Sequence, residues 1–191
     1  MPGRSLARLV ADALEPRSWM IVLVVLLGWH ADGPAGVGWG LVIGLFAAIF
    51  PVLFVRHGVR HWQWTSRRVS LRRERMAALA FTIASDAAGA VTMRALGAPP
   101  PMTGYILGML ATSVTVTAIS SAWKISVHCV VASATVALLA LTYGPAVLPG
   151  YALVALVAWS RVALGDHTAA QVAGGAALGS AAAVLTHLAV S

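Results

Sequence analysis

Charged side chains are scarce in this chain of 191 residues. Asp, Glu, Lys and Arg supply 10% of it, whereas a soluble domain carries about 25%. Hydrophobic residues supply 59%, and the mean hydropathy is +0.84. Aromatic residues contribute only 7%, so most of the hydrophobicity comes from small aliphatic side chains, which suit close helix packing in lipid. The composition excludes an ordinary soluble domain and predicts an all-α integral membrane protein.

Acidic residues and cysteine are also rare. Six Asp and Glu stand against thirteen Lys and Arg, which gives a formal net charge of +7. In a soluble protein this excess would suggest a nucleic-acid partner. Here the arginines lie beside apolar segments, so we expect membrane lipids as partners and no nucleic acid. Cys129 is the only cysteine, which excludes an intramolecular disulfide and leaves the redox compartment open.

Apolar segments divide the chain and predict its architecture. They cover residues 19–29, 37–55, 76–97, 102–122, 129–142, 146–159 and 169–190. We expect a polytopic membrane helix bundle with six or seven transmembrane helices, because the first segment is short for a span of about 20 residues. Residues 1–191 are predicted to form a single integral-membrane domain, in which residues 1–18 make an interfacial amphipathic helix. The sequence leaves the oligomeric state open.

Three polar patches separate pairs of apolar segments. They are 56–75, 124–128 and 160–168. Because two apolar segments lie between each patch and the next, we expect all three patches at one membrane face. The first patch holds the densest group of arginines, so we predict that it is a basic cytoplasmic loop.

The second and third patches carry residues suited to an anion site. We expect Asp166 to cap a new helix, which would place His167 in its first turn. Free N–H groups and the helix dipole favour phosphate at such a position. Ser126 is likewise expected to cap the helix that carries His128.

Permanent positive charge accompanies these histidines. Arg75, Lys124 and Arg161 flank the apolar segments, and arginine is suited to bidentate phosphate contacts. Two histidines with separate roles permit covalent phosphoryl transfer, because one attacks phosphorus while the other protonates the leaving alkoxide.

The third patch resembles a motif of the type-2 phosphatidic acid phosphatase superfamily, which includes lipid phosphate phosphatases and shares its site with vanadium haloperoxidases. That motif is Ser-Arg, five residues, His, three residues, Asp. The chain has Ser160-Arg161, five residues, His167, three residues and then Gln171.

The other two motifs of the superfamily have weaker counterparts in the same order. The second motif, Pro-Ser-Gly-His, is similar to Ile125-Ser126-Val127-His128. The first, Lys, six residues, Arg-Pro, is nearest to Arg68, six residues and Arg75-Met76. The resemblance covers roughly residues 65–180.

The resemblance implies a function and assigns roles. His167 would be the nucleophile that forms a phosphohistidine, and His128 the general acid. Phosphate ligands would be Arg68, Arg75, Ser126 and Arg161, with Lys124 in place of the missing first-motif lysine. It implies a small bacterial enzyme of the inner (plasma) membrane that uses no metal and no cofactor. Its substrate would be a lipid phosphate or diphosphate. The short chain, in which the sequence suggests no soluble domain for headgroup recognition, favours an isoprenoid or polyprenyl type over a phosphatidic-acid-like or phospho-sugar lipid.

One departure from the family motif keeps an alternative open. Gln171 replaces the family's Asp, and it can accept a hydrogen bond from His167 at i+4 but supplies no charge. Asp166 is adjacent to His167, but neighbouring helical side chains do not face each other. The alternative is a non-catalytic membrane protein that binds or carries anionic phospholipid or prenyl phosphate.

Asp86 is an ionisable residue within a predicted span, which is a functional position by default. The sequence leaves three roles open for it: a proton or substrate group, a partner of Arg94, or a group that faces the bundle. His57 and His61 have the i, i+4 spacing of metal ligands, but the sequence suggests no third ligand and we expect no metal.

Overall fold

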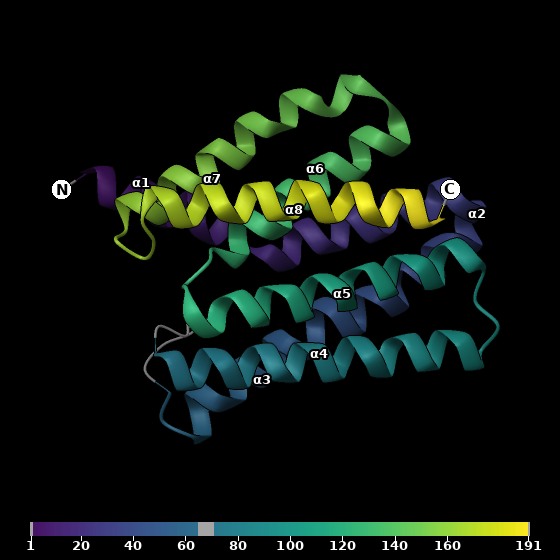
Figure 1. Ribbon diagram of the computed structural model, residues 1–191, viewed down its shortest axis with the longest axis horizontal. Coiled ribbons are helices and arrows are strands. Elements are labelled where there is room, and N and C mark those ends of the chain that lie inside the picture. The colour runs from purple at the N-terminus through teal and green to yellow at the C-terminus, as the bar shows by residue number, and fades with distance from the viewer. Residues whose placement is uncertain (1, 65–70, 191) are drawn as a thin grey trace.

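The computed structural model describes residues 2–64 and 71–190, and these form a bundle of helices (Figure 1). Its elements are α1 (Pro2–Ala13), α2 (Pro16–Gly44), the π-helix η1 (Leu45–Ile49), α3 (Phe50–His61), α4 (Arg72–Ala95), α5 (Pro100–Ala122), α6 (Val127–Tyr143), the 3-10 helix η2 (Pro145–Gly150), α7 (Tyr151–Ala163) and α8 (Ala169–Val190). The described part of the chain contains no strand. The predicted all-α class is confirmed.

Several helices have the length and composition of membrane spans. The five stretches that qualify are Ser5–His61, Arg72–Ala95, Pro100–Ala122, Pro145–Ala163 and Ala169–Val190, and the apolar helix Val127–Tyr143 is shorter. Large hydrophobic side chains such as Val91, Leu107 and Leu185 point outward. A hydrophobic exterior over helices of this length is what an integral membrane bundle presents to lipid.

The first of these stretches reverses within α2. Asp32 and Gly33 have non-helical backbone angles, and Gly33 has a φ of 51°. A Cβ atom added at Gly36 would collide with the carbonyl oxygen of Gly28, so only glycine lets the two arms approach this closely. The small-residue spacing of this segment thus serves helix packing, and the first apolar run pairs antiparallel with the second.

The predicted loop at 56–75 is wrong at both ends. Residues 56–61 belong to α3 and residues 72–75 belong to α4. Arginine is a good helix former, and the basic side chains of Arg60 and His61 in the last turn of α3 interact favourably with the helix dipole. Trp64, which follows the end of α3, packs its ring against Gly58.

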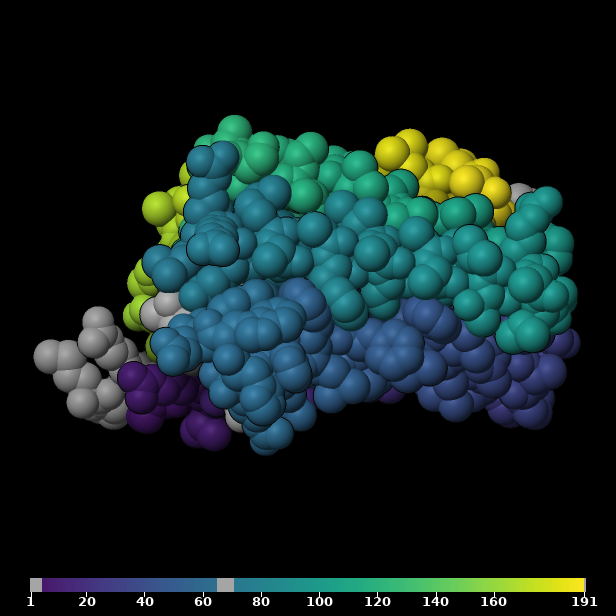
Figure 2. All heavy atoms as spheres, turned by 90° about the horizontal axis from the view of Figure 1, so that it is seen from below, coloured from purple at the N-terminus to yellow at the C-terminus, as the bar shows by residue number. Residues whose placement is uncertain are grey.

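The ends of the helices confirm that the polar patches share one face. The end of α3, the start of α4, the α5–α6 connection and the α7–α8 connection all lie at one end of the bundle, on the left of Figure 1. Figure 2 shows α3 lying against α4 at that same end, where the rings of Phe54 and Phe81 stack with centroids 4.1 Å apart.

Helices α6 and α8 hold two of these patches together. A Cβ atom at Gly175 would lie 2.7 Å from the carbonyl oxygen of Ser126, and one at Gly179 would collide with that of Val130. Two glycines spaced by four residues therefore let α8 press against the first turns of α6. This packing fixes the start of α8 beside the helix turn that carries His128.

Candidate functional site

The turn after α7 brings Asp166 back over Arg161. Gly165 has a φ of +74°. Its N–H donates to the carbonyl of Val162 at 2.9 Å, and the N–H of Asp166 donates to the carbonyl of Arg161 at 3.0 Å. These two bonds form the Schellman arrangement that ends a helix at a glycine. The chain reverses here, so a residue beyond the helix end meets a residue of its last turn.

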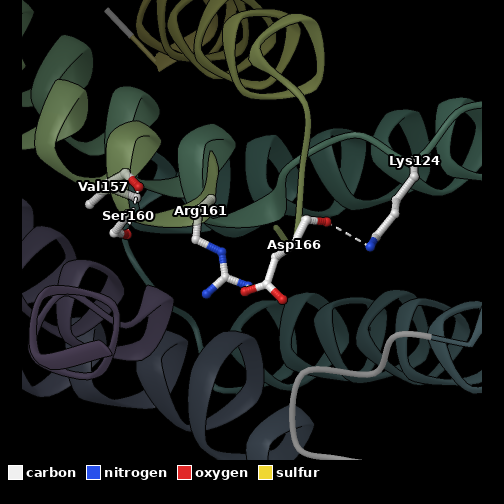
Figure 3. A network of polar contacts seen from close by, with 5 residues as sticks. All are labelled: Lys124, Val157, Ser160, Arg161 and Asp166. Atoms are coloured by element: carbon white, nitrogen blue, oxygen red, sulfur yellow. Dashed lines mark hydrogen bonds and ion pairs between the residues drawn. The ribbon is translucent and has the colours of Figure 1, made fainter. Parts of the chain in front are cut away.

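The reversal creates an ion pair between these two side chains. Nη2 of Arg161 lies 2.9 Å from Oδ2 of Asp166, and the close-up shows the carboxylate facing the guanidinium (Figure 3). Arg161 is 3% exposed. A charge buried to this extent requires an anionic partner. The Asp166 carboxylate supplies that partner.

The predicted start of α8 is corrected by two residues. The helix begins at Ala169. Just before it, the Oγ1 of Thr168 accepts a hydrogen bond from the N–H of Gln171 at 3.3 Å. In return, the N–H of Thr168 donates a hydrogen bond to Oε1 of Gln171 at 3.1 Å. This reciprocal pair is a capping box. The predictions that Asp166 caps α8 and that His167 lies in its first turn are wrong. The Thr-x-x-Gln pattern in the sequence is the signal that would have located this cap.

Lys124 reaches the same turn from the α5–α6 connection. Its Nζ donates to the backbone carbonyl of Asp166 at 2.7 Å. In Figure 3 it approaches Asp166 from the side opposite Arg161. Two cations, one from the α5–α6 connection and one from the last turn of α7, therefore meet at one residue, which confirms that the second and third polar patches converge.

Ser126, at the start of α6, is bonded to α8 through its backbone. Its N–H donates to the carbonyl of Gln171 at 3.3 Å. Ser126 stands at the N-cap of α6, as predicted, but its side chain makes no capping bond. Its Oγ is buried and forms no hydrogen bond of standard geometry within the described residues. His128 lies two residues further on and is half-buried.

His167 lies in the loop between Arg161 and α8, and is half-buried. Burial, followed by the positive charges of Lys124 and Arg161, lowers the pKa of His167 from 6.5 to about 4, against the opposing effects of Gln171 and Asp166. Its Nδ1 is buried and has no hydrogen-bonding partner among the described residues. The imidazole is therefore neutral at pH 7, which is the form that acts as a nucleophile.

Arg75 binds elsewhere at this end of the bundle. Its Nη2 donates to the carbonyl of Ser120 at 3.4 Å, and Nη2 of Arg72 donates to the carbonyl of Ser121 at 2.6 Å. Both cations thus stabilise the C-terminal end of α5. A role for Arg75 as a phosphate ligand stays a prediction. Arg68 lies outside the described residues.

The site as described combines fixed positive charge with a neutral imidazole. Lys124 and Arg161 can hold an anion, and His167 and Ser126 offer buried polar atoms beside them. Within residues 2–64 and 71–190, no group of three or more His, Cys, Asp or Glu side chains converges as metal ligands would. Comparison with known proteins identifies no relative, since no family model, no curated protein and no solved structure matches this chain.

Proposed function

We propose that this chain is a membrane phosphatase that hydrolyses the phosphate monoester or diphosphate of a lipid without a metal. The observation that carries the proposal is the convergence of Lys124 and Arg161 on Asp166, next to the neutral imidazole of His167. A polar centre of net positive charge at the end of an apolar bundle suits a substrate whose phosphate is anchored in a bilayer by its lipid.

The chemistry begins with exchange of one anion for another. The phosphate takes the place of the Asp166 carboxylate on Arg161, whose guanidinium offers two parallel N–H donors. Lys124 adds a second positive charge, and together they offset the charge that develops on the transferring phosphoryl group.

Phosphoryl transfer then uses the two histidines. The unprotonated nitrogen of His167 attacks phosphorus, so that a P–N bond forms while the bond from phosphorus to the lipid oxygen breaks. His128 donates a proton to the leaving oxygen. Water then attacks the phosphohistidine, a proton returns to His128, and inorganic phosphate leaves.

The lipid class and the location belong to the same proposal. An isoprenoid or polyprenyl phosphate is favoured over a phosphatidic-acid-like or phospho-sugar lipid. The arginines at the ends of α3 and α4 support a cytoplasmic position for this face in a bacterial inner membrane, by the bias of positive charge toward the cytoplasm. The resemblance of Ser126, His128, Arg161 and His167 to the type-2 phosphatidic acid phosphatases supports the reaction type.

A second candidate function is a non-catalytic carrier of anionic lipid. Two observations favour it. Gln171 stands where the resembling family has a charged Asp, and its side chain is engaged in the capping box with Thr168. In this reading Lys124 and Arg161, which we call the cationic cradle, exchange the Asp166 carboxylate for a lipid phosphate. The lipid phosphate is later released unchanged.

The test is phosphate release by purified protein in detergent, with a chelator present. The substrates are farnesyl diphosphate, undecaprenyl phosphate and phosphatidic acid. We expect release from at least one lipid, a loss of roughly 10³-fold or more in His167→Ala, and a loss of about 10²- to 10⁴-fold in His128→Ala. The matched control is His30→Ala, because His30 packs against Tyr143 at the opposite end of α6.

A covalent intermediate separates the two candidate functions. Acid quenching during turnover of a ³²P-labelled substrate should leave label on the peptide that contains His167. Folded protein that binds these lipids and releases no phosphate would support the carrier instead, and release that survives in His167→Ala would overturn the phosphohistidine.

A further inference from the structure

A cavity in the bundle is lined by residues of α2, η1, α3, α4, α5, α6 and α8. Its volume is about 220 Å³, and its walls are mainly apolar side chains such as Leu23 and Val116. Along α6 it runs from Val127 to Leu138, a distance of about 16 Å at 1.5 Å per residue. The hydrocarbon core of a bilayer is about 30 Å thick. The cavity therefore has the length of one hydrocarbon chain within a single leaflet.

Two charged side chains line this mainly apolar wall among the described residues: Arg17, which pairs with Glu15, and Asp86. Asp86 of α4 lines the cavity and is 1% exposed. The hydroxyl of Ser113 donates to its Oδ2 at 2.7 Å. Its Oδ1 is buried and accepts no hydrogen bond from any described residue. Arg94, one partner that the sequence suggested, is exposed and forms no ion pair with it among the described residues, so Asp86 faces the bundle.

Neighbouring polar side chains do not serve this oxygen. The hydroxyls of Thr82 and Thr112 also line the cavity, but they donate to the carbonyls of Ala78 and Gly108 in their own helices. A carboxyl group at this depth is costly unless its atoms are satisfied. Linking α4 to α5 requires only the bond to Ser113, which leaves the second oxygen of Asp86 without a structural role.

We propose that the cavity binds an amphiphile whose apolar chain fills the space and whose hydroxyl or ammonium group donates a hydrogen bond to Oδ1 of Asp86. A hydroxyl and an ammonium group are both hydrogen-bond donors, which is what this acceptor requires. The apolar wall supplies affinity for the chain through burial, and Asp86 supplies the preference for a donor over a plain hydrocarbon. The site requires no turnover at the loops, so it stands whether or not the chain is a phosphatase.

The experiment is photolabelling of the full chain in lipid nanodiscs. The probe is dodecanol that carries a diazirine on its chain, and modified residues are mapped by mass spectrometry. We expect label on cavity-lining residues of α5 and α6. Dodecanol and dodecylamine should each compete at least about tenfold better than dodecane, since an unmade hydrogen bond to a buried acceptor costs about one factor of ten or more in affinity.

Three variants make the test specific. Ala134→Phe fills the cavity from α6 and should remove its labelling, whereas the matched change Ala155→Phe lies on an exposed position of α7 and should leave it intact. Asp86→Leu should remove the preference for the alcohol and the amine while the chain still binds.

The order of the competitors distinguishes the donors. An amine stronger than the alcohol assigns a charged donor to Asp86, and equal competition assigns a neutral hydrogen bond. The proposal is overturned if dodecane competes as well as dodecanol in the wild type, or if Ala134→Phe labels like the wild type. These two results decide even where Asp86→Leu fails to fold, and neither depends on phosphate release.

Discussion

Asp166 is half-buried and Asp86 is buried, and the two carboxylates have opposite surroundings. Asp166 lies in the loop after α7, where it pairs with the guanidinium of Arg161 and its backbone carbonyl receives Lys124. Asp86 lies within α4, where its described hydrogen-bonding partner is the neutral hydroxyl of Ser113. At Asp166, two cations outnumber one carboxylate, so that centre suits an added anion. At Asp86, Oδ1 accepts no hydrogen bond from a described residue and therefore suits an added donor.

Depth in the bundle explains the difference. At the end of the helices, charged side chains gather where water and lipid headgroups solvate them. Inside the span an unpaired charge is costly, so polar groups there are few and are bonded to other helices. The two carboxylates therefore differ in their partners because they lie at different depths in the bundle.

Among the charged side chains of the polar end, loss of Arg161 should have the largest effect. Arg161→Ala removes the guanidinium that we propose as a phosphate ligand, and we expect phosphate release to fall about 10²- to 10³-fold, as for removal of a transition-state donor. Arg161→Lys should retain part of the rate, because it keeps the charge but loses the paired donors. The exposed Arg94→Ala serves as the control, and an equal loss in that variant would point to general destabilisation.

Loss of the Asp166 charge should act in the opposite direction. Asp166→Asn removes the carboxylate that competes with phosphate for Arg161, so we expect inorganic phosphate to bind about tenfold more tightly, or by ~1.4 kcal/mol. Isothermal titration calorimetry measures this directly. Asp86→Asn is the matched change inside the bundle and should leave phosphate affinity unchanged. Weaker binding in Asp166→Asn would show that this carboxylate supports the site rather than occupying it.

The pH dependence of stability should reveal the charges around His167. Its pKa in the folded chain is lowered to about 4, whereas an unfolded histidine titrates near its ordinary value of about 6.5. Between these values the unfolded chain binds the proton first, so stability should fall as the pH decreases from about 6.5 to 4. Lys124→Gln removes one of the cations that lower this pKa, so the loss of stability should become smaller.

Thermal unfolding in detergent across this pH range measures the effect. His167→Gln provides the reference, because a side chain that does not titrate should abolish the contribution. If the unfolding temperature of the wild type changes with pH no more than that of His167→Gln, the lowered pKa of His167 is contradicted.

Ser113→Ala should give the smallest change. It deprives Asp86 of its donor and should lower stability by about 1 kcal/mol, or about 2–4 °C in the unfolding temperature for a chain of this size. Phosphate release should not change, since the loops at the end of the bundle are untouched. A large loss of release in this variant would show that the two carboxylates are coupled through the bundle.

Local and periodic signals were sufficient to predict much of this architecture. Hydropathy predicted the helices, and the abundance of small side chains predicted close helix packing, which the structure shows at Gly36 and along α8. The pairing of apolar segments placed Lys124, Arg161 and His167 at one end. Each of these features follows from residues that are near in sequence or from a simple rule of alternation across a membrane.

The errors arose where a long-range or competing contact decides the structure. Asp166 is a good helix cap by type, but the Schellman turn at Gly165 aims it at Arg161, and Thr168 takes the capping position instead. The prediction of a basic loop at 56–75 was wrong at its ends because α3 and α4 extend into that segment. The partner of Asp86 depends on the contact of α4 with α5, which the pattern of the sequence alone does not determine.

The most direct test of the cationic cradle is an NMR titration of the chain with ¹⁵N-labelled histidine, in detergent, against inorganic phosphate. Phosphate bound at Lys124 and Arg161 should shift the signals of His167 and raise its pKa above about 4, because an added anion favours the imidazolium. The signals of His30, at the other end of the bundle, should not move. If His167 is unaffected at saturating phosphate, or moves no more than His30, these residues do not form a phosphate site.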